Sequence, residues 1–340
     1  MTYILRKTSV KELINELKKY EVYAPIKNDS IVSFSKFDGK NELYLDFINS
    51  IVPPKSILFP QTEKMFEFII NKEGINIKQN ENKKEIVIFG IRPCDAKSFK
   101  ILDPLFKEKY VDTYYQEKRD KLILIGLACN EPDINCFCPS FNETPYSTNG
   151  LDILLTDLGD RYTVDVITEN GKKIIDENRK FFEKANDIDI NKRNELHKSS
   201  LAKIKRKIEI DGTSEKLGLI YEHQFWSNIA KRCIGCGICT YSCPTCHCFD
   251  IQDEALGGKG RRVRIWDSCM YPEYTLQASG YNPRPRREDR IKNRVYHKYK
   301  WYFENFNTLA CVGCGRCINN CPVNIDIIEI LSIVKESKNE

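Results

Sequence analysis

Two cysteine runs in the last third of the chain share one spacing, C-x2-C-x2-C-x3-C-P. They are Cys233-Ile-Gly-Cys236-Gly-Ile-Cys239-Thr-Tyr-Ser-Cys243-Pro244 and Cys311-Val-Gly-Cys314-Gly-Arg-Cys317-Ile-Asn-Asn-Cys321-Pro322. In this spacing the first three thiolates bind one iron–sulfur cubane, and the fourth Cys usually ligates the cluster of the other run. The spacing therefore predicts two [4Fe–4S] clusters, held by Cys233, Cys236, Cys239 and Cys321 and by Cys311, Cys314, Cys317 and Cys243.

The residues between these cysteines also favour clusters over zinc. A zinc site needs only two C-x2-C pairs and leaves the third Cys and the Pro of each run unexplained. The glycines of both runs can take φ values that other residues resist, so the backbone can curl closely around an inorganic core. Each Pro suits the first turn of a following helix, whose positive end would face an anionic cluster. We therefore predict that the chain carries electrons.

Length, apolar runs and cysteine content indicate the size of the protein and the compartment in which we expect it. Its 340 residues can bury a large core and suggest two domains. No run reaches the roughly 18 consecutive apolar residues of a membrane helix, and the first residues show no apolar signal core. Fifteen cysteines in an unexported chain indicate metal ligation in a reducing compartment, so we expect a cytoplasmic protein.

The formal net charge of +5 counts every thiol as neutral. Each [4Fe–4S] core with four thiolates carries about −2, so two clusters leave the chain near +1 and three leave it near −1. Residues 259–300 are rich in Arg and Lys, which a nucleic-acid face would also require. Because no recognised nucleic-acid motif accompanies them, we favour a shell of cations around the clusters, or a docking face for an acidic partner.

The fold class predicted is mixed: an N-terminal α/β domain followed by an α-helical ferredoxin-like domain. Residues 85–90 and 121–126 are apolar runs typical of buried strands, and 95–110 between them has helical spacing. Strand, helix and strand of this length predict a parallel βαβ unit. We also expect an amphipathic helix over 9–20 and a hairpin over 152–166 that turns at Gly159-Asp160.

The domain boundaries follow changes in composition. We expect the α/β domain over 1–185, a polar helical connector over 186–217 and the helical dicluster domain over 218–340, whose last helix covers 325–334. Sixty-seven residues separate Cys243 from Cys311, more than in a compact bacterial ferredoxin. This insert favours a ferredoxin domain in which helices separate the two binding loops. The glycines of 257–260 lack the frame of a P-loop and indicate a turn.

Four further cysteines stand in the predicted α/β domain. Cys94 follows the first apolar strand and Cys129 the second, with Cys136 and Cys138 shortly after. The carboxyl ends of neighbouring parallel strands meet at the crevice where such sheets bind ligands, and the nearby C-x-C completes four soft ligands. We predict a third [4Fe–4S] cluster here. Buried free thiols and a zinc ion on the same residues are the alternatives.

The last three cysteines have no assigned role. Cys246 and Cys248 flank His247 just after the first run, and Cys269 follows Trp266-Asp-Ser. Three thiols and an imidazole are sufficient for another metal site. Packing beside the clusters, or hydrogen bonding to cluster sulfurs, explains these residues equally well.

Several other kinds of site are absent from the sequence. No G-x-G-x-x-G follows a strand, so there is no dinucleotide fingerprint. The four histidines, and the Ser and Cys residues, form no protease or triad pattern: His197, His223, His247 and His297. We predict no substrate site, and any hydride chemistry must come from a partner that carries a flavin.

Six segments together resemble the iron–sulfur β subunit of soluble sulfhydrogenases, a relative of the A-subunit of anaerobic sulfite reductase. They are Gly90-Ile-Arg-Pro-Cys-Asp95, Gly126 to Cys138, Cys233 to Asp253, Arg264-Ile-Trp-Asp-Ser-Cys269, Gly280-Tyr-Asn-Pro-Arg-Pro and Cys311 to Pro322. The resemblance implies that both C-terminal runs ligate clusters and that the four N-terminal cysteines are a third set. Arg-Pro before Cys94 departs from the Arg-Ala typical of the sulfite reductase protein.

The resemblance implies an electron-relay subunit of a cytoplasmic oxidoreductase complex. Such a subunit passes electrons between a flavoprotein that oxidises NAD(P)H and a catalytic hydrogenase or a sulfur- or heterodisulfide-type reductase, with ferredoxin as a further potential partner. We expect neither nucleic acid nor membrane as a partner. The alternatives are the A-subunit of an anaerobic sulfite reductase and, from another class, an iron–sulfur sensor with a labile cluster and a nucleic-acid face.

Overall fold

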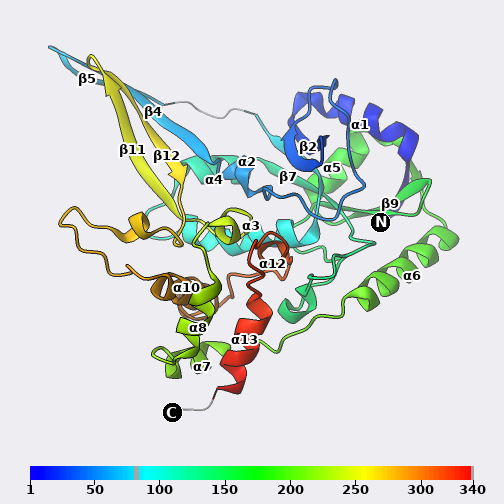
Figure 1. Ribbon diagram of the computed structural model, residues 1–340. Coiled ribbons are helices and arrows are strands. Elements are labelled where there is room, and N and C mark those ends of the chain that lie inside the picture. Colours follow the sequence, from blue (N-terminus) through cyan, green and yellow to red (C-terminus); the bar gives the residue numbers. More distant parts are fainter. Residues whose placement is uncertain (80–83, 338–340) are drawn as a thin grey trace.

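A computed structural model describes residues 1–79 and 84–337, which form two β-sheets and a group of helices (Figure 1). The larger sheet has eight strands in the order β10-β1-β9-β8-β7-β6-β2-β3. Its strands are β1 Thr2–Arg6, β2 Glu21–Asn28, β3 Ile31–Lys36, β6 Ile86–Ile91, β7 Leu122–Leu127, β8 Ile153–Asp157, β9 Arg161–Val166 and β10 Phe182–Lys184.

The centre of this sheet is parallel. Strands β2, β6, β7 and β8 pair in parallel, and every residue of β6 and β7 is buried, as their unbroken apolar sequences require. Helices α3 (Pro93–Phe106) and α4 (Thr113–Asp120) connect β6 to β7, which confirms the predicted βαβ unit. The predicted hairpin is also confirmed, because β8 and β9 pair antiparallel on either side of Gly159-Asp160.

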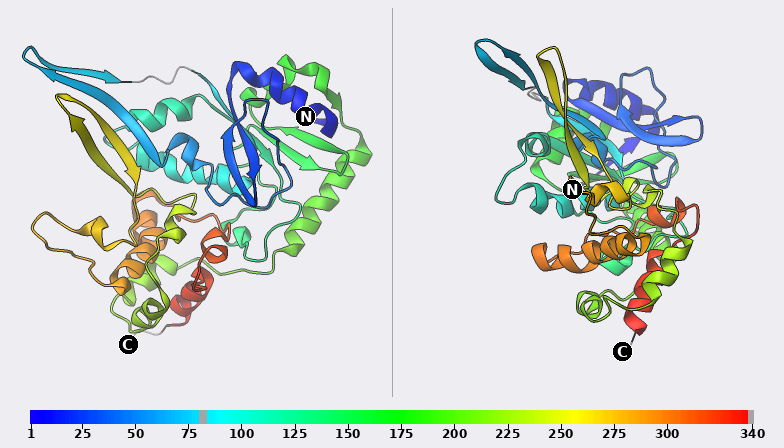
Figure 2. Two further views of the ribbon diagram at one scale, coloured as in Figure 1. Left: turned by 45° about the horizontal axis from the view of Figure 1, so that its top comes forward. Right: turned by 60° about the vertical axis from the view of Figure 1, so that its left-hand side comes forward.

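Helices cover both faces of the sheet (Figure 2). Helices α1 (Val10–Glu16) and α5 (Glu169–Glu177) pack on one face through Leu13, Ile14 and Ile174. Helices α2 (Lys55–Leu58), α3 and α4 contribute Leu58, Phe99 and Tyr115, among other side chains, to the core on the opposite face. The helix predicted over 9–20 is present, and its last turn is the 3-10 helix η2 Leu17–Lys19. The remaining 3-10 helices of this half are η1 Lys7–Ser9, η3 Cys138–Phe141 and η4 Arg179–Phe181.

The second sheet extends away from the rest of the molecule in both views (Figures 1 and 2). Its order is β11-β12-β4-β5, and all neighbours are antiparallel. The expected turn at 257–260 is confirmed, because Gly257 and Gly258 lie at the tip of the β11–β12 hairpin with positive φ. The strands are β4 Thr62–Asn71, β5 Gly74–Gln79, β11 Phe249–Leu256 and β12 Lys259–Trp266.

This hairpin departs from the predicted, mostly helical C-terminal domain. Its charged residues pair across the two strands: Arg261 with Glu254 and Arg262 with Asp253. Because β12 also pairs with β4, the sheet joins strands from both halves of the chain. The boundaries at 186 and 218 stay predictions.

The remaining helices surround a third core built on Trp226, Tyr296 and Leu331. The predicted connector is helical up to Lys203 and irregular over 204–212. No described helix is both long and apolar enough to span a bilayer. The helices are α6 Asp187–Lys203, α7 Thr213–Leu219, α8 Phe225–Arg232, α9 Ile238–Tyr241, α10 Arg287–Tyr296, α11 Tyr302–Phe306, α12 Arg316–Asn319 and α13 Ile327–Glu336, with the 3-10 helix η5 Pro272–Thr275 and the π-helix η6 His297–Trp301.

Candidate iron–sulfur sites

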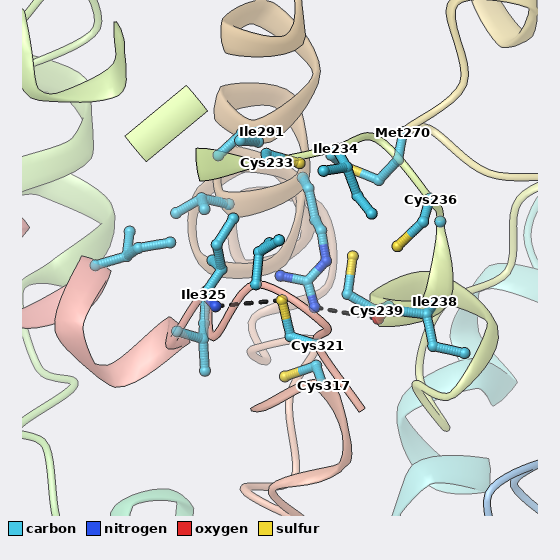
Figure 3. A pocket seen from close by; sticks show the side chains of 16 residues that line it. Cys233, Ile234, Cys236, Ile238, Cys239, Met270, Ile291, Cys317, Cys321 and Ile325 are labelled. Atoms are coloured by element: carbon cyan, nitrogen blue, oxygen red, sulfur yellow. Dashed lines mark hydrogen bonds between the residues drawn. The ribbon is translucent and has the colours of Figure 1, made fainter. Parts of the chain in front are cut away.

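The first predicted ligand set lines one cavity (Figure 3). Cys233 follows α8, Cys239 lies in the short helix α9, and Cys321 arrives from the second run after α12. Backbone N–H groups already point at two of the sulfurs: Gly235 donates to Cys233 at 3.3 Å and Ile325 donates to Cys321 at 3.2 Å. Apolar side chains form most of the remaining wall: Ile234, Ile238, Met270, Ile291, Val295, Val323, Ile325, Ile327 and Ile330.

The second predicted set lines a neighbouring cavity. Here Cys311, Cys314 and Cys317 of the second run meet Cys243 of the first, together with Phe137, Tyr299 and Lys298. The structure therefore brings each crossed set of four thiols together, as the spacing requires of two cubanes. The assignment of individual ligands stays a prediction.

The expectation for the two prolines is wrong. Turns follow both Pro244 and Pro322, and no helix begins at either residue. After Pro322 the backbone passes through Asn324 at φ 53°, and α13 begins only where Asp326 accepts a hydrogen bond from Ile328 N–H. The short helices α9 and α12 instead begin directly after Gly237 and Gly315, inside the cysteine runs.

Two buried cations line these cavities. Arg294 lines both of them and donates to the carbonyl of Cys239 at 3.2 Å, while its Nε has no hydrogen-bond partner among the described residues. Lys298 donates to Thr245 Oγ1 at 2.9 Å and to the carbonyl of Ala310. Burial alone would lower the pKa of both side chains, but nearby cysteine sulfurs reverse this and raise it.

These cations fit anionic groups in the cavities. Among the described residues, neither Arg294 nor Lys298 has a carboxylate partner, yet both are more than nine-tenths buried. A buried charge is retained only when it is paired. Two cubanes, each with about two negative charges, would supply that compensation, and of the basic residues of 259–300 only Arg294 and Lys298 line these cavities. Other charges of the same stretch are paired differently: Arg264 binds Glu63 and Asp112.

The four N-terminal cysteines also gather at one place. Cys94 stands in the first turn of α3 and Cys129 follows β7, at the carboxyl ends of two parallel strands, as predicted. Burial and the neighbouring charge of Cys129 raise the pKa of Cys136 and Cys138. Burial also raises the pKa of Cys94 and Cys129. Such thiols stay neutral unless a metal deprotonates them, and metal coordination does so outright.

This N-terminal set adjoins the second cavity. Phe137 N–H donates to the carbonyl of Gly313 at 2.8 Å, and the Cys136 thiol approaches the carbonyl of Cys314 at 3.8 Å. A Cβ on Gly313 would lie 2.6 Å from the backbone of Phe137 and Cys138. Glycine at this position therefore serves close backbone packing as well as its positive φ of 65°.

The three unassigned cysteines lie beside the predicted ligands, and His247 does not point toward them. His247 packs against the ring of His297 in an edge-to-face contact and against the tilted ring of Tyr302, and its Nδ1 forms a hydrogen bond with the carbonyl of Thr245, so it does not join the thiols. Cys246 interacts with the Cys243 thiol, whereas Cys248 and Cys269 interact with each other. Within the described ranges, no three Cys, His, Asp or Glu side chains converge as ligands of a single metal ion.

Sequence reasoning missed one residue near these thiols. Lys55 is 2% exposed, lies with its Nζ 4.3 Å from the ring centre of Trp266, and donates to the carbonyl of Cys246. The charges of Cys246, Cys243 and Cys248 all act on this ammonium group. No local sequence pattern marks Lys55, because Lys55 and Cys246 are 191 positions apart in the chain.

Comparison with known proteins agrees with this geometry. Residues 232–325, which contain both cysteine runs, match the family model of a 4Fe-4S dicluster domain. The chain is thus an iron–sulfur protein with two [4Fe–4S] clusters. Over 327 residues, or 96% of each chain, it is 33% identical to sulfhydrogenase 2 subunit beta of Pyrococcus furiosus. The chain belongs to the family of sulfhydrogenase beta subunits. No solved structure is significantly similar to it.

Proposed function

We propose that this chain is the electron-relay subunit of a cytoplasmic oxidoreductase complex of the sulfhydrogenase type. The observation that carries the proposal is the adjacency of three thiol sets. Arg294 and Cys317 line both C-terminal cavities, and the Cys136 thiol reaches the backbone of Cys314. When bound, each [4Fe–4S] cluster supplies one-electron transfer over a range of potentials.

The residues of the chain have defined parts in this proposal. Thiolates anchor the clusters, the backbone N–H groups of Gly235 and Ile325 stabilise two of these cysteine sulfurs, and Arg294 and Lys298 balance the negative charge. The ligands would be Cys233, Cys236, Cys239 and Cys321 for the first cluster, Cys311, Cys314, Cys317 and Cys243 for the second, and Cys94, Cys129, Cys136 and Cys138 for a third.

The partners follow from what the chain lacks and from what it resembles. Its sequence has no dinucleotide fingerprint, so a flavoprotein would exchange electrons with NAD(P)H. The name of the relative, a sulfhydrogenase subunit, supports a hydrogenase as the catalytic partner. The same name favours a sulfhydrogenase-type complex over an anaerobic sulfite reductase. Arg264 and Arg294 are buried, which weighs against a nucleic-acid sensor, since these residues cannot contact phosphates.

Iron and acid-labile sulfide counts on protein purified without air test the ligand sets. We expect about 12 iron atoms per chain in the wild type and about 8 in Cys94→Ser, with one EPR signal lost. Cys248→Ser, a thiol outside the three sets, is the matched control and should retain about 12. A wild-type count near 8 that Cys94→Ser leaves unchanged would show that the N-terminal thiols bind no cubane. Bound zinc would support the zinc alternative.

The relay itself has a separate test. The chain should copurify with a flavoprotein and accept electrons from NADH only in its presence. Isolated protein that oxidises NADH unaided would contradict a pure relay.

A further inference from the structure

Cys248 and Cys269 face each other at the base of the β11–β12 hairpin. Cys248 immediately precedes β11, and the ladder continues one step beyond it, where Asp267 N–H donates to the Cys248 carbonyl at 3.0 Å. The chain then turns, and the side chains of Cys269 and Cys248 come close enough to interact, packed in the same core. Neither thiol belongs to the three sets of ligands described above.

The surroundings suit a reactive thiol. The Tyr274 hydroxyl and the Lys55 ammonium group both lie near the Cys248 sulfur. The Cys269 thiol, its N–H and the Tyr274 hydroxyl together hold the pKa of Cys248 below its usual value, although burial opposes them. Cys248 and Tyr274 are partly exposed, whereas Cys269 is 6% exposed. An accessible, stabilised thiolate beside a buried second thiol is the arrangement of a redox-active pair.

A metal site on these residues is disfavoured by the same geometry. Cys246, the third thiol nearby, is engaged with Cys243, and His247 packs against two aromatic rings. Two thiols alone do not complete the four ligands of zinc or of a cubane.

The pair is also close to the clusters. Cys269 is followed by Met270, which lines the first cavity, and preceded by Ser268, whose Oγ lies 2.8 Å from Thr240 Oγ1 between Cys239 and Cys243. Cys248, Cys269 and several predicted ligands pack in one core.

We propose that Cys248 and Cys269 are a dithiol that cycles with a disulfide and acts as a two-electron centre beside the one-electron carriers. Oxidation forms one S–S bond and removes two electrons together with the protons that the two thiols carry. A soluble disulfide takes up the electrons and protons and becomes two thiols, whereas two one-electron acceptors of the iron–sulfur class take the electrons and leave the protons to solvent. Only this second route rests on the proposed function.

The test equilibrates the full-length, cluster-loaded protein with mixtures of oxidised and reduced dithiothreitol in the absence of air. After acid quenching, free thiols are alkylated and unreduced peptides are measured by mass spectrometry. A peptide that links Cys248 to Cys269 should appear, and its ratio to the unlinked form should rise tenfold for each tenfold rise in the oxidised-to-reduced ratio. Cys248→Ser and Cys269→Ser should abolish this transition, whereas Cys246→Ser should retain it.

Iron content measured on the same samples separates this inference from the proposed function. We expect Cys248→Ser and Cys269→Ser to keep the wild-type iron count. Loss of iron in either variant would identify the residue as a ligand and overturn the dithiol. Wild-type protein in which both thiols are alkylated at every ratio would overturn it too, without reliance on any variant. Low iron in the wild type would instead count against the proposed clusters.

Discussion

Arg316 donates two hydrogen bonds, each 2.7 Å long, to the two carboxylate oxygens of Asp95, and both residues are 1% exposed. Asp95 directly follows Cys94 at the start of α3, and Arg316 directly precedes Cys317 in α12. This buried ion pair therefore fixes the N-terminal thiol set against the second C-terminal set.

Removal of either partner should destabilise the protein strongly. Asp95→Asn leaves the Arg316 guanidinium buried without its carboxylate, and Arg316→Met does the reverse. Each change should lower the free energy of unfolding by about 3–5 kcal/mol, measured by anaerobic denaturation.

The double variant Asp95→Leu/Arg316→Met separates pairing from packing. It should be more stable than either single variant, because no uncompensated charge remains. The exposed pair of Arg232 and Glu329 offers a comparison, since Arg232→Met should cost less than about 1 kcal/mol. Equal losses from the buried and the exposed pair would contradict this account.

Lys298 should raise the reduction potential of the neighbouring cluster. The reduced state carries one more negative charge, and the buried ammonium stabilises it. Lys298→Met should therefore lower the potential by roughly 50–100 mV, which corresponds to roughly 1–2 kcal/mol of charge interaction at an effective dielectric constant of about 20. EPR-monitored titration measures the shift.

Lys231, exposed at the end of α8, is the matched control for this measurement. Solvent and salt screen an exposed charge, so Lys231→Met should leave both potentials nearly unchanged. An unaltered potential in Lys298→Met, at full iron content, would show that the lysine serves packing alone.

The local sequence was sufficient to predict the dicluster domain, for a physical reason. A cubane imposes its spacing on consecutive residues, so the C-x2-C-x2-C pattern is visible without any knowledge of the fold. The strands that end near Cys94 and Cys129 were visible too, because buried parallel strands are continuously apolar.

Contacts between distant parts of the chain were not visible. Nothing in the sequence pairs β12 with β4, or brings Lys55 to Cys246, because both contacts depend on how the two halves pack. The prediction that a helix begins at Pro322 is wrong because Asp326 caps α13 with its own side chain, and the helix begins there instead.

Gly313→Ala should disrupt the junction between the second and third thiol sets. Its Cβ would lie 2.6 Å from the backbone of Phe137 and Cys138, neither of which can move without displacing the loop. We expect lower iron content and a loss of stability well above 1 kcal/mol. Gly212→Ala is the control, because Gly212 has a similar φ of 70° but open space around it. This variant should lower the free energy of unfolding by only about 1–2 kcal/mol and should keep the wild-type iron content. Equal losses of stability and of iron in the two variants would show that close packing at Gly313 is not the cause.

His197 should make stability depend on pH, away from the clusters. Its ring stacks on Tyr146 with 4.2 Å between centroids, and its Nε2 lies 2.9 Å from Thr156 Oγ1. Burial, with a smaller effect of the charge of Arg193, lowers the pKa of His197 to about 4. In the unfolded chain His has a pKa of about 6.5, so the unfolded state binds more protons between these values.

Stability is therefore complete above about pH 6.5 and falls as the pH decreases toward about 4. From pH 7 to pH 5 the free energy of unfolding should fall by about 1–2 kcal/mol through this group, after allowance for its partial exposure. His197→Gln can keep a hydrogen bond to Thr156 but cannot titrate. The difference between wild type and this variant, measured by denaturation at both pH values, isolates the histidine because other acid-sensitive groups cancel. An identical pH dependence in the two proteins would mean that protonation of His197 costs the fold nothing.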